Sequence, residues 1–135
     1  EICACLVGSE MCIRDRSIAA MAAIRADETD IQNILTACEN AEKLLLANKN
    51  HTEKDIAFHA AIALSSKNIV VPKLVPIINS SIPLISDSKE YTMRDETIEI
   101  HREIADAIAA HDAVRAHDAM YLHLIYNRKH IKSIN

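Results

Sequence analysis

Hydrophobic residues recur every three or four positions along most of this chain, which is the period of an amphipathic helix. A short stripe of this kind runs through residues 18–25, and longer stripes run through 28–48, 94–110 and 112–128. Asp27 stands directly before the first long stripe, where a short acidic side chain commonly caps a helix. The pattern therefore predicts four helices in these segments.

Two further segments between residues 50 and 80 are also predicted to be helical. Thr52 opens one of them, and its side chain is placed to cap the backbone N–H of Asp55. The other, 68–78, is very apolar, and Pro76 is expected to kink or interrupt it. Residues 80–92 predict a loop or a short helix. Together these segments predict an all-α fold, an antiparallel bundle of about six or seven helices.

The composition agrees with this prediction. One glycine and three prolines are present in 135 residues, and aromatic residues make up 3% of the chain. Proteins built from sheets use more turn-forming and aromatic residues, so strands are not expected. The length is sufficient for one domain with its own core, which we assign to residues 17–135.

Residues 1–16 differ from the rest of the chain. They contain Gly8, the only glycine, and three of the four cysteines, and they show no helical period. The sequence does not begin with Met, and we expect this stretch to be a non-native or disordered leader. We assign no chemistry to it.

Charge and hydropathy narrow the classes of function. The formal net charge is −4 with histidine counted as neutral, which gives no electrostatic reason for this chain to bind nucleic acid. The longest apolar runs are far too short to span a bilayer. A cytoplasmic protein with reduced thiols and no membrane partner is the interpretation these features favour.

Histidine is the residue type that suggests chemistry, and seven are present. Asp55 and His59 are four residues apart and project from one helix face. His101 and His123 each lie in an apolar stripe, where an imidazole is costly to bury unless it is hydrogen-bonded or coordinated. Three imidazoles and one carboxylate on converging helices would hold a divalent metal, with Zn²⁺ ranked first and Ni²⁺ or Mn²⁺ as alternatives.

A second interpretation of the same residues stays open on spacing alone. A histidine on an apolar helix face is often a hydrogen-bonded core residue, and Asp55 has a structural role available as the capping partner of Thr52. The chain would then be a structural helical interaction domain without a metal.

Two segments of the chain resemble the signatures of a known family. Asp55-Ile-Ala-Phe-His59, followed by Ser65 and Asn68, is similar to the D-x-x-F-H…A-S-x-N segment of the C-terminal ligand-binding (FCD) domain of GntR-type, FadR-like transcription regulators. The second signature, H-x-x-I-x-x-A-I…D…A…M-x-x-H, is similar to the run from His101 to His123. Upstream, Ala22-Ala23 followed by Arg25 resembles the end of the family's first helix. The resemblance covers roughly residues 15–130.

The resemblance implies an antiparallel helical bundle with a divalent metal held by Asp55, His59, His101 and His123. It also implies a cavity above the metal for a small organic carboxylate effector, and a homodimer whose DNA-binding domains respond to that effector. Asn68 matches a family position near the site.

This sequence departs from the family pattern at two places. The family's N-terminal winged helix-turn-helix domain is absent, so DNA is expected to be a partner only through that domain. The family arginine that reaches the ligand carboxylate corresponds to a position near Met11. Arg94 and Arg128 are possible substitutes, chosen from their charge alone.

An enzymatic alternative rests on two dipeptides. His111-Asp112 and His117-Asp118 resemble motifs of HD-type, metal-dependent phosphohydrolases, in which a bound metal activates water. Adjacent residues on a helix point about 100° apart, and these histidines lie off the apolar stripe. We therefore predict a sensor domain and not an enzyme.

Overall fold

The structure of this chain, a computed structural model, describes residues 9–70, 73 and 94–134, with side chains for 16–70, 73 and 94–126. These residues contain helices and no strand, which confirms the all-α prediction for this part of the chain. The predicted number of six or seven helices stays a prediction, since residues 74–93 and most of the predicted helix 68–78 lie outside the described residues. The helices are α2 (Ser9–Arg25), α3 (Glu28–Leu46), α4 (Thr52–Ser65), α7 (Arg94–Ala109) and α8 (Ala113–Ile134).

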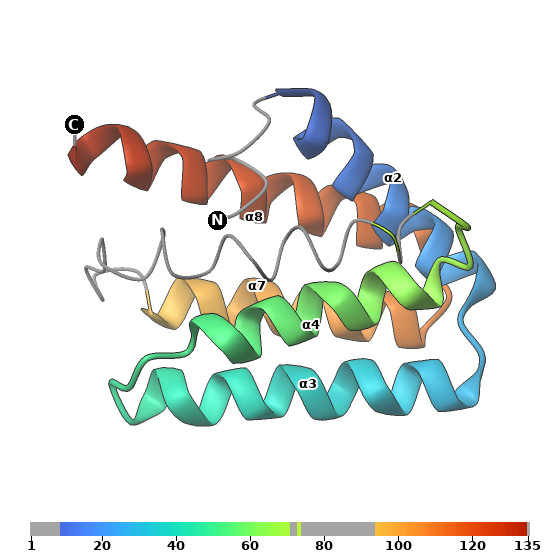
Figure 1. Cartoon of the computed structure of the whole chain (residues 1–135), viewed down its shortest axis with the longest axis horizontal. Helices are drawn as coiled ribbons and strands as arrows, with labels where there is room; N and C mark the ends of the chain where they lie inside the picture. Colours follow the sequence, from blue (N-terminus) through green and yellow to red (C-terminus); the bar gives the residue numbers. More distant parts are fainter. Residues whose placement is uncertain (1–8, 71–72, 74–93, 135) are drawn as a thin grey trace.

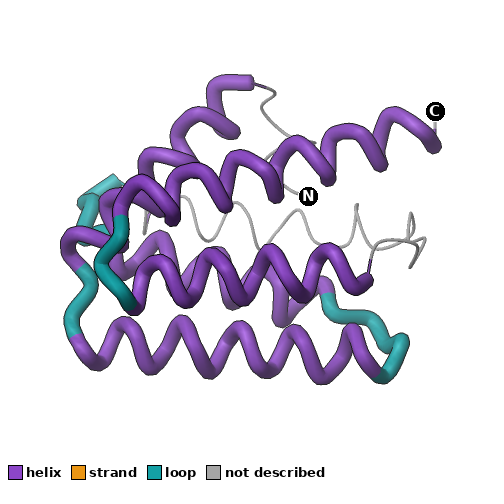
Figure 2. The backbone as a smooth tube through the Cα atoms, turned by 180° about the vertical axis from the view of Figure 1, so that it is seen from behind, coloured by secondary structure: helices purple, strands orange, loops and turns teal. Residues whose placement is uncertain are grey.

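The helices form two antiparallel pairs with α2 packed across one of them (Figure 1). α3 pairs with α4, α7 pairs with α8, and α2 lies mainly against α8. Figure 2 shows the α2–α3 and α7–α8 connections and the end of α4 at one end of the bundle, with the α3–α4 connection at the other. None of the described helices is long and apolar enough to cross a membrane.

Alanine and isoleucine are the commonest residues of the core. Ala19, Ala22 and Ala23 of α2 are fully buried, and side chains of this size let two helix backbones approach closely. Larger residues fill the space between the two pairs, because a core must be packed to high density. They include Phe58, Ile62, Ile104 and Ile108, each at most 1% exposed.

The predicted cap of the first long helix is confirmed. Asp27 precedes α3, and its side chain accepts a hydrogen bond of 2.9 Å from the backbone N–H of Asp30. The Asp30 carboxylate in turn accepts one of 3.1 Å from the N–H of Asp27. This reciprocal capping box satisfies two N–H groups that a helix start leaves without intrahelical partners.

The predicted cap of α4 by Thr52 is wrong. Thr52 is already the first helical residue, and the N–H of Asp55 donates to the carbonyl oxygen of His51 at 2.8 Å. The N–H of Thr52 donates to the side-chain oxygen of Asn50 at 3.0 Å. Backbone and Asn50 acceptors therefore take the bonds that we had assigned to a Thr52–Asp55 pair, and Asp55 does not serve as a capping partner.

The first described helix begins earlier than the periodicity predicted. α2 starts at Ser9, eight residues before the expected start of helical structure at Ser17. After Gly8 the sequence contains neither glycine nor proline until Pro72, so no strong helix breaker opposes the extension. The wider assignment of residues 1–16 to a leader stays a prediction.

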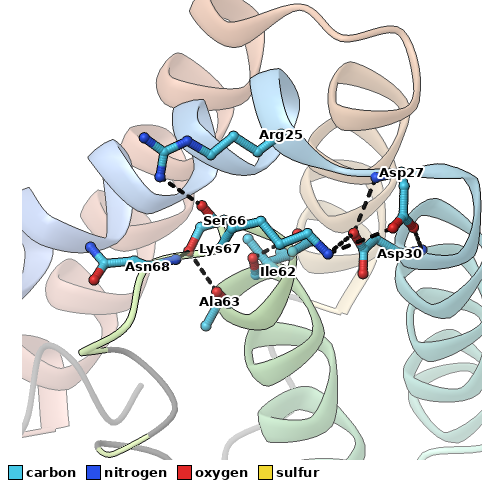
Figure 3. A network of polar contacts seen from close by, with 9 residues as sticks. Arg25, Asp27, Asp30, Ile62, Ala63, Ser66, Lys67 and Asn68 are labelled. Carbon is cyan, nitrogen blue, oxygen red and sulfur yellow. Dashed lines mark hydrogen bonds and ion pairs between the residues drawn. The ribbon is translucent and has the colours of Figure 1, made fainter.

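A network of polar contacts ties the α2–α3 connection to the end of α4 (Figure 3). Arg25 donates a hydrogen bond of 3.1 Å to the carbonyl oxygen of Ser66. The ammonium of Lys67 lies 2.6 Å from the Asp30 carboxylate and 3.7 Å from that of Asp27. Lys67 thus binds the capping box of α3 from the residue that follows the last turn of α4.

These contacts shift the pKa values of both partners. Partial burial raises the pKa of Asp30, but hydrogen bonds from Lys67 and the Asp27 backbone outweigh it and hold the pKa below the ordinary 3.8. The hydrogen bond to Asp30 raises the pKa of Lys67 above 10.5. The lowered acid contributes stability that is lost as the pH falls through its folded-state pKa, and the raised base contributes stability that is lost above pH 10.5.

We predict that the Lys67→Ala variant is less stable than the wild type by a constant amount between about pH 5 and pH 9. The difference should shrink as the pH falls below 3.8, because protonation of Asp30 removes the ion pair from the wild type as well. Urea unfolding of both proteins, from acid pH to about pH 9, measures this difference in stability. A difference that stays unchanged down to pH 2.5 would contradict an ionic contribution.

Candidate metal centre

Four side chains from three helices converge inside the bundle. Asp55 and His59 project from the same face of α4 because residues four apart on a helix are neighbours. His101 comes from α7 and His123 from α8. Each offers one potential ligand atom, and these atoms all lie within 4.8 Å of one another.

Three of the separations between these atoms are close to the spacing of ligands around one ion. The Nε2 atoms of His59 and His123 are 3.2 Å apart, and Nε2 of His101 lies 3.2 Å from Oδ1 of Asp55. Nε2 of His59 lies 3.7 Å from the same carboxylate oxygen. Two atoms each about 2.1 Å from a tetrahedral ion would lie roughly 3.4 Å apart. The cluster could therefore hold a metal with little rearrangement.

Burial of the polar atoms in this cluster costs free energy unless another group binds them. His101 and His123 are 2% and 1% exposed. Both ring nitrogens of His101 and Oδ1 of Asp55 are buried and make no hydrogen bond with the residues that the structure describes. Buried polar atoms of this kind carry a desolvation cost. A cation at their centre would offset it for the atoms that face inward.

Aromatic packing orients the imidazoles. The ring of Phe58, fully buried, lies 4.8 Å from the ring of His101 between centroids, tilted by 36°. The rings of His59 and His123 stack at 5.2 Å with 19° between their planes. Phe58 thus supports the site without offering a ligand atom. The sequence pattern predicts no role for Phe58, although its position next to His59 in the D-x-x-F-H segment indicates that it lies near the site.

The residues proposed for effector binding lie at the ends of helices. The side chain of Asn68 accepts the N–H of Val70 at 3.0 Å, directly after α4. Arg94 donates to the side chains of Asn48 at 3.0 Å and Asp95 at 3.2 Å. Arg94 begins α7, about two turns before His101. The side chain of Arg128 lies outside the described residues. Their role in ligand binding stays a prediction.

The dipeptides of the hydrolase alternative lie elsewhere. Nδ1 of His111 bonds to the carbonyl oxygen of Ala23 at 2.8 Å, and Nδ1 of His117 lies 3.2 Å from its neighbour Asp118. In the part of the chain that the structure describes, the group able to hold a metal includes neither histidine.

Comparison with known proteins shows the family of this chain. The FCD domain family matches residues 15–125. An uncharacterised HTH-type transcriptional regulator of Bacillus subtilis (strain 168), YcbG, is 31% identical over 114 residues, which is 84% of this chain and 48% of that protein. The solved structure of a Streptococcus agalactiae GntR superposes with a TM-score of 0.74 at 32% identity, covering 87% of this chain and 54% of that one.

These findings confirm the resemblance drawn from the two sequence signatures, and the relatives are transcription regulators rather than enzymes. The chain spans about half the length of the relatives it matches.

A surface groove of about 410 Å³ lies between α3 and α7, away from the four converging residues. The buried thiol of Cys38 lines it, and Arg102 pairs with Glu42 at its rim. Burial first, and then the nearby carboxylates of Glu42 and Asp106, raise the pKa of Cys38 from 9.0 to about 11. The thiol is therefore protonated at neutral pH.

We predict that Cys38 reacts with iodoacetamide at pH 8 at least about a hundredfold more slowly in the folded protein than in urea, because two pKa units remove that share of thiolate. Mass spectrometry of a variant with Cys3, Cys5 and Cys12 replaced by serine follows this one thiol. Rates within tenfold of each other would show that its environment does not protect it.

Proposed function

This chain belongs to the FCD domain family, and we propose that it is the effector-sensing domain of a GntR-type, FadR-like transcription regulator. Asp55, His59, His101 and His123 would hold one divalent metal, which would supply a Lewis-acidic centre for an oxygen of a small organic carboxylate. The observation that carries the proposal is the convergence of three imidazole nitrogens and one carboxylate oxygen within 4.8 Å.

The ligand set favours Zn²⁺, with Ni²⁺ and Mn²⁺ as alternatives. Imidazole nitrogen suits the late transition metals, whereas Ca²⁺ and Mg²⁺ prefer sites made of oxygen. A metal with four protein ligands and a coordination number of five or six keeps a position open for an effector oxygen. When bound, the metal would supply a Lewis acid, and the three helices would fix the imidazoles that hold it.

The same proposal extends to the parent regulator. The effector shifts a conformational equilibrium only as far as it binds one state more tightly than the other. A winged-helix domain in the remaining half of the regulator would contact DNA, and two copies would form a homodimer in the cytoplasm. The formal net charge of −4 offers no electrostatic reason for this chain itself to bind DNA.

We expect the purified chain to carry about one equivalent of metal, because its four candidate ligands converge on a single point. The Asp55→Ala/His101→Ala variant should carry none, because it loses two ligands from two helices. Elemental analysis measures both. His117→Ala is the matched control and should retain the metal, since His117 lies outside the cluster. A chain that stays metal-free after reconstitution would contradict the proposal and favour a structural helical domain without a metal.

We further expect binding of small carboxylates to depend on the metal. Calorimetric titration with acetate, lactate and malate should give heat with the Zn²⁺-loaded chain for at least one of them. The heat should vanish after removal of the metal and dialysis of the chelator, because the open coordination position is lost. An affinity that is the same with and without metal would contradict this mechanism.

A further inference from the structure

Three non-glycine residues in the described part of the chain adopt a positive φ. They are Asn48 (53°), Lys67 (58°) and His111 (56°). This left-handed conformation crowds the β-carbon, so glycine usually fills such positions at helix ends. A strained residue that is not glycine points to a use for its side chain.

The side chains of Lys67 and His111 both bind residues 23–30, which we call the α2–α3 connection and which include the last turn of α2 and the first turn of α3. Lys67 binds Asp30 of the α3 capping box (Figure 3). His111 donates from Nδ1 to the carbonyl oxygen of Ala23, in the last turns of α2. The N–H of Asp27, four residues on, bonds to Asp30 instead, so His111 supplies the partner that the helix itself does not.

The two residues come from the ends of the helices that carry the metal cluster. Lys67 follows α4, whose residues include Asp55 and His59, and His111 lies in the turn between α7 and α8. Neither α2 nor α3 contributes to the cluster. The α2–α3 connection is thus held at one point to α4 and at another to the α7–α8 turn.

We propose that Lys67 and His111 form a clamp that couples occupancy of the metal centre to the α2–α3 connection. This inference rests on the proposed function, since it requires a metal at the cluster. A metal fixes α4 relative to α7 and α8. Lys67 lies beyond His59 and His111 lies beyond His101 by about 12–15 Å along the helix axes, and the two clamp residues then hold residues 23–30 more tightly.

The coupling between two sites is reciprocal, which gives the proposal a second measurable consequence. If metal tightens the clamp by some factor, an intact clamp must raise metal affinity by the same factor. A contact that merely adds stability would change the unfolding transition and leave metal affinity unchanged. The imidazole can donate from Nδ1 whether it is neutral or protonated, so the clamp does not require a change of charge.

The test is hydrogen exchange of the 135-residue chain with and without Zn²⁺. Metal should slow exchange of the amides in the α2–α3 connection roughly fivefold or more, the lower end of typical coupling between sites. Amides at the far end of α3, near residues 43–49, report local fraying and should change by less than twofold. A metal effect of equal size at both ends would indicate general stabilisation and overturn the proposal.

Glycine substitution separates coupling from stability. In the Lys67→Gly/His111→Gly variant, relief of the left-handed backbone offsets the lost contacts, so global stability should change little. The metal effect on residues 23–30 should nevertheless disappear, and the Kd for Zn²⁺ should rise by the same factor. Asn48→Gly makes the same backbone change at the opposite end of the bundle and should retain both.

The outcomes distinguish failure of the clamp from failure of the proposed function on which it rests. A wild-type chain that binds no Zn²⁺ would refute the metal centre and the clamp together. A chain that binds Zn²⁺ without slower exchange at residues 23–30, or a double glycine variant that keeps the effect, would refute the clamp alone.

Discussion

Burial of the polar side-chain atoms of Asp55, His101 and His123 among alanine and isoleucine side chains is the constraint on which the arrangement of α4, α7 and α8 depends. His101 and His123 are almost completely excluded from solvent, and each places Nε2 toward an atom from another helix. A slip of one helical residue would turn a ring into the hydrocarbon core, away from these polar neighbours. The cluster therefore adds its own constraint on the register of three helices to that of their apolar stripes.

Much of this arrangement could be predicted from the sequence because helical periodicity assigns side chains to faces. The spacing of Asp55 and His59, and the apolar neighbours of His101 and His123, placed all four residues toward the core. Periodicity does not determine how helix ends interact across the bundle. The ion pair of Lys67 with Asp30 and the bond from His111 to Ala23 join residues 37 and 88 positions apart, and no local pattern marks such partners.

The bounds and caps of the helices were predicted less well than the helices themselves. Several groups compete for the first N–H groups of a helix, and at α4 the carbonyl of His51 and the side chain of Asn50 win over Thr52. The contact of Arg94 with Asn48, in the α3–α4 connection, joins residues from distant parts of the sequence, so the sequence pattern gave no signal for it either.

The order of the four residues along the chain has a consequence for how the protein would acquire an ion. Asp55 and His59 are neighbours, but His101 and His123 follow after long intervals, so an unfolded chain presents only one close pair. Gathering the other two requires closing those intervals first. An ion would consequently bind the finished bundle far better than the open chain, and its binding energy would protect the native state against unfolding and proteolysis rather than start its formation.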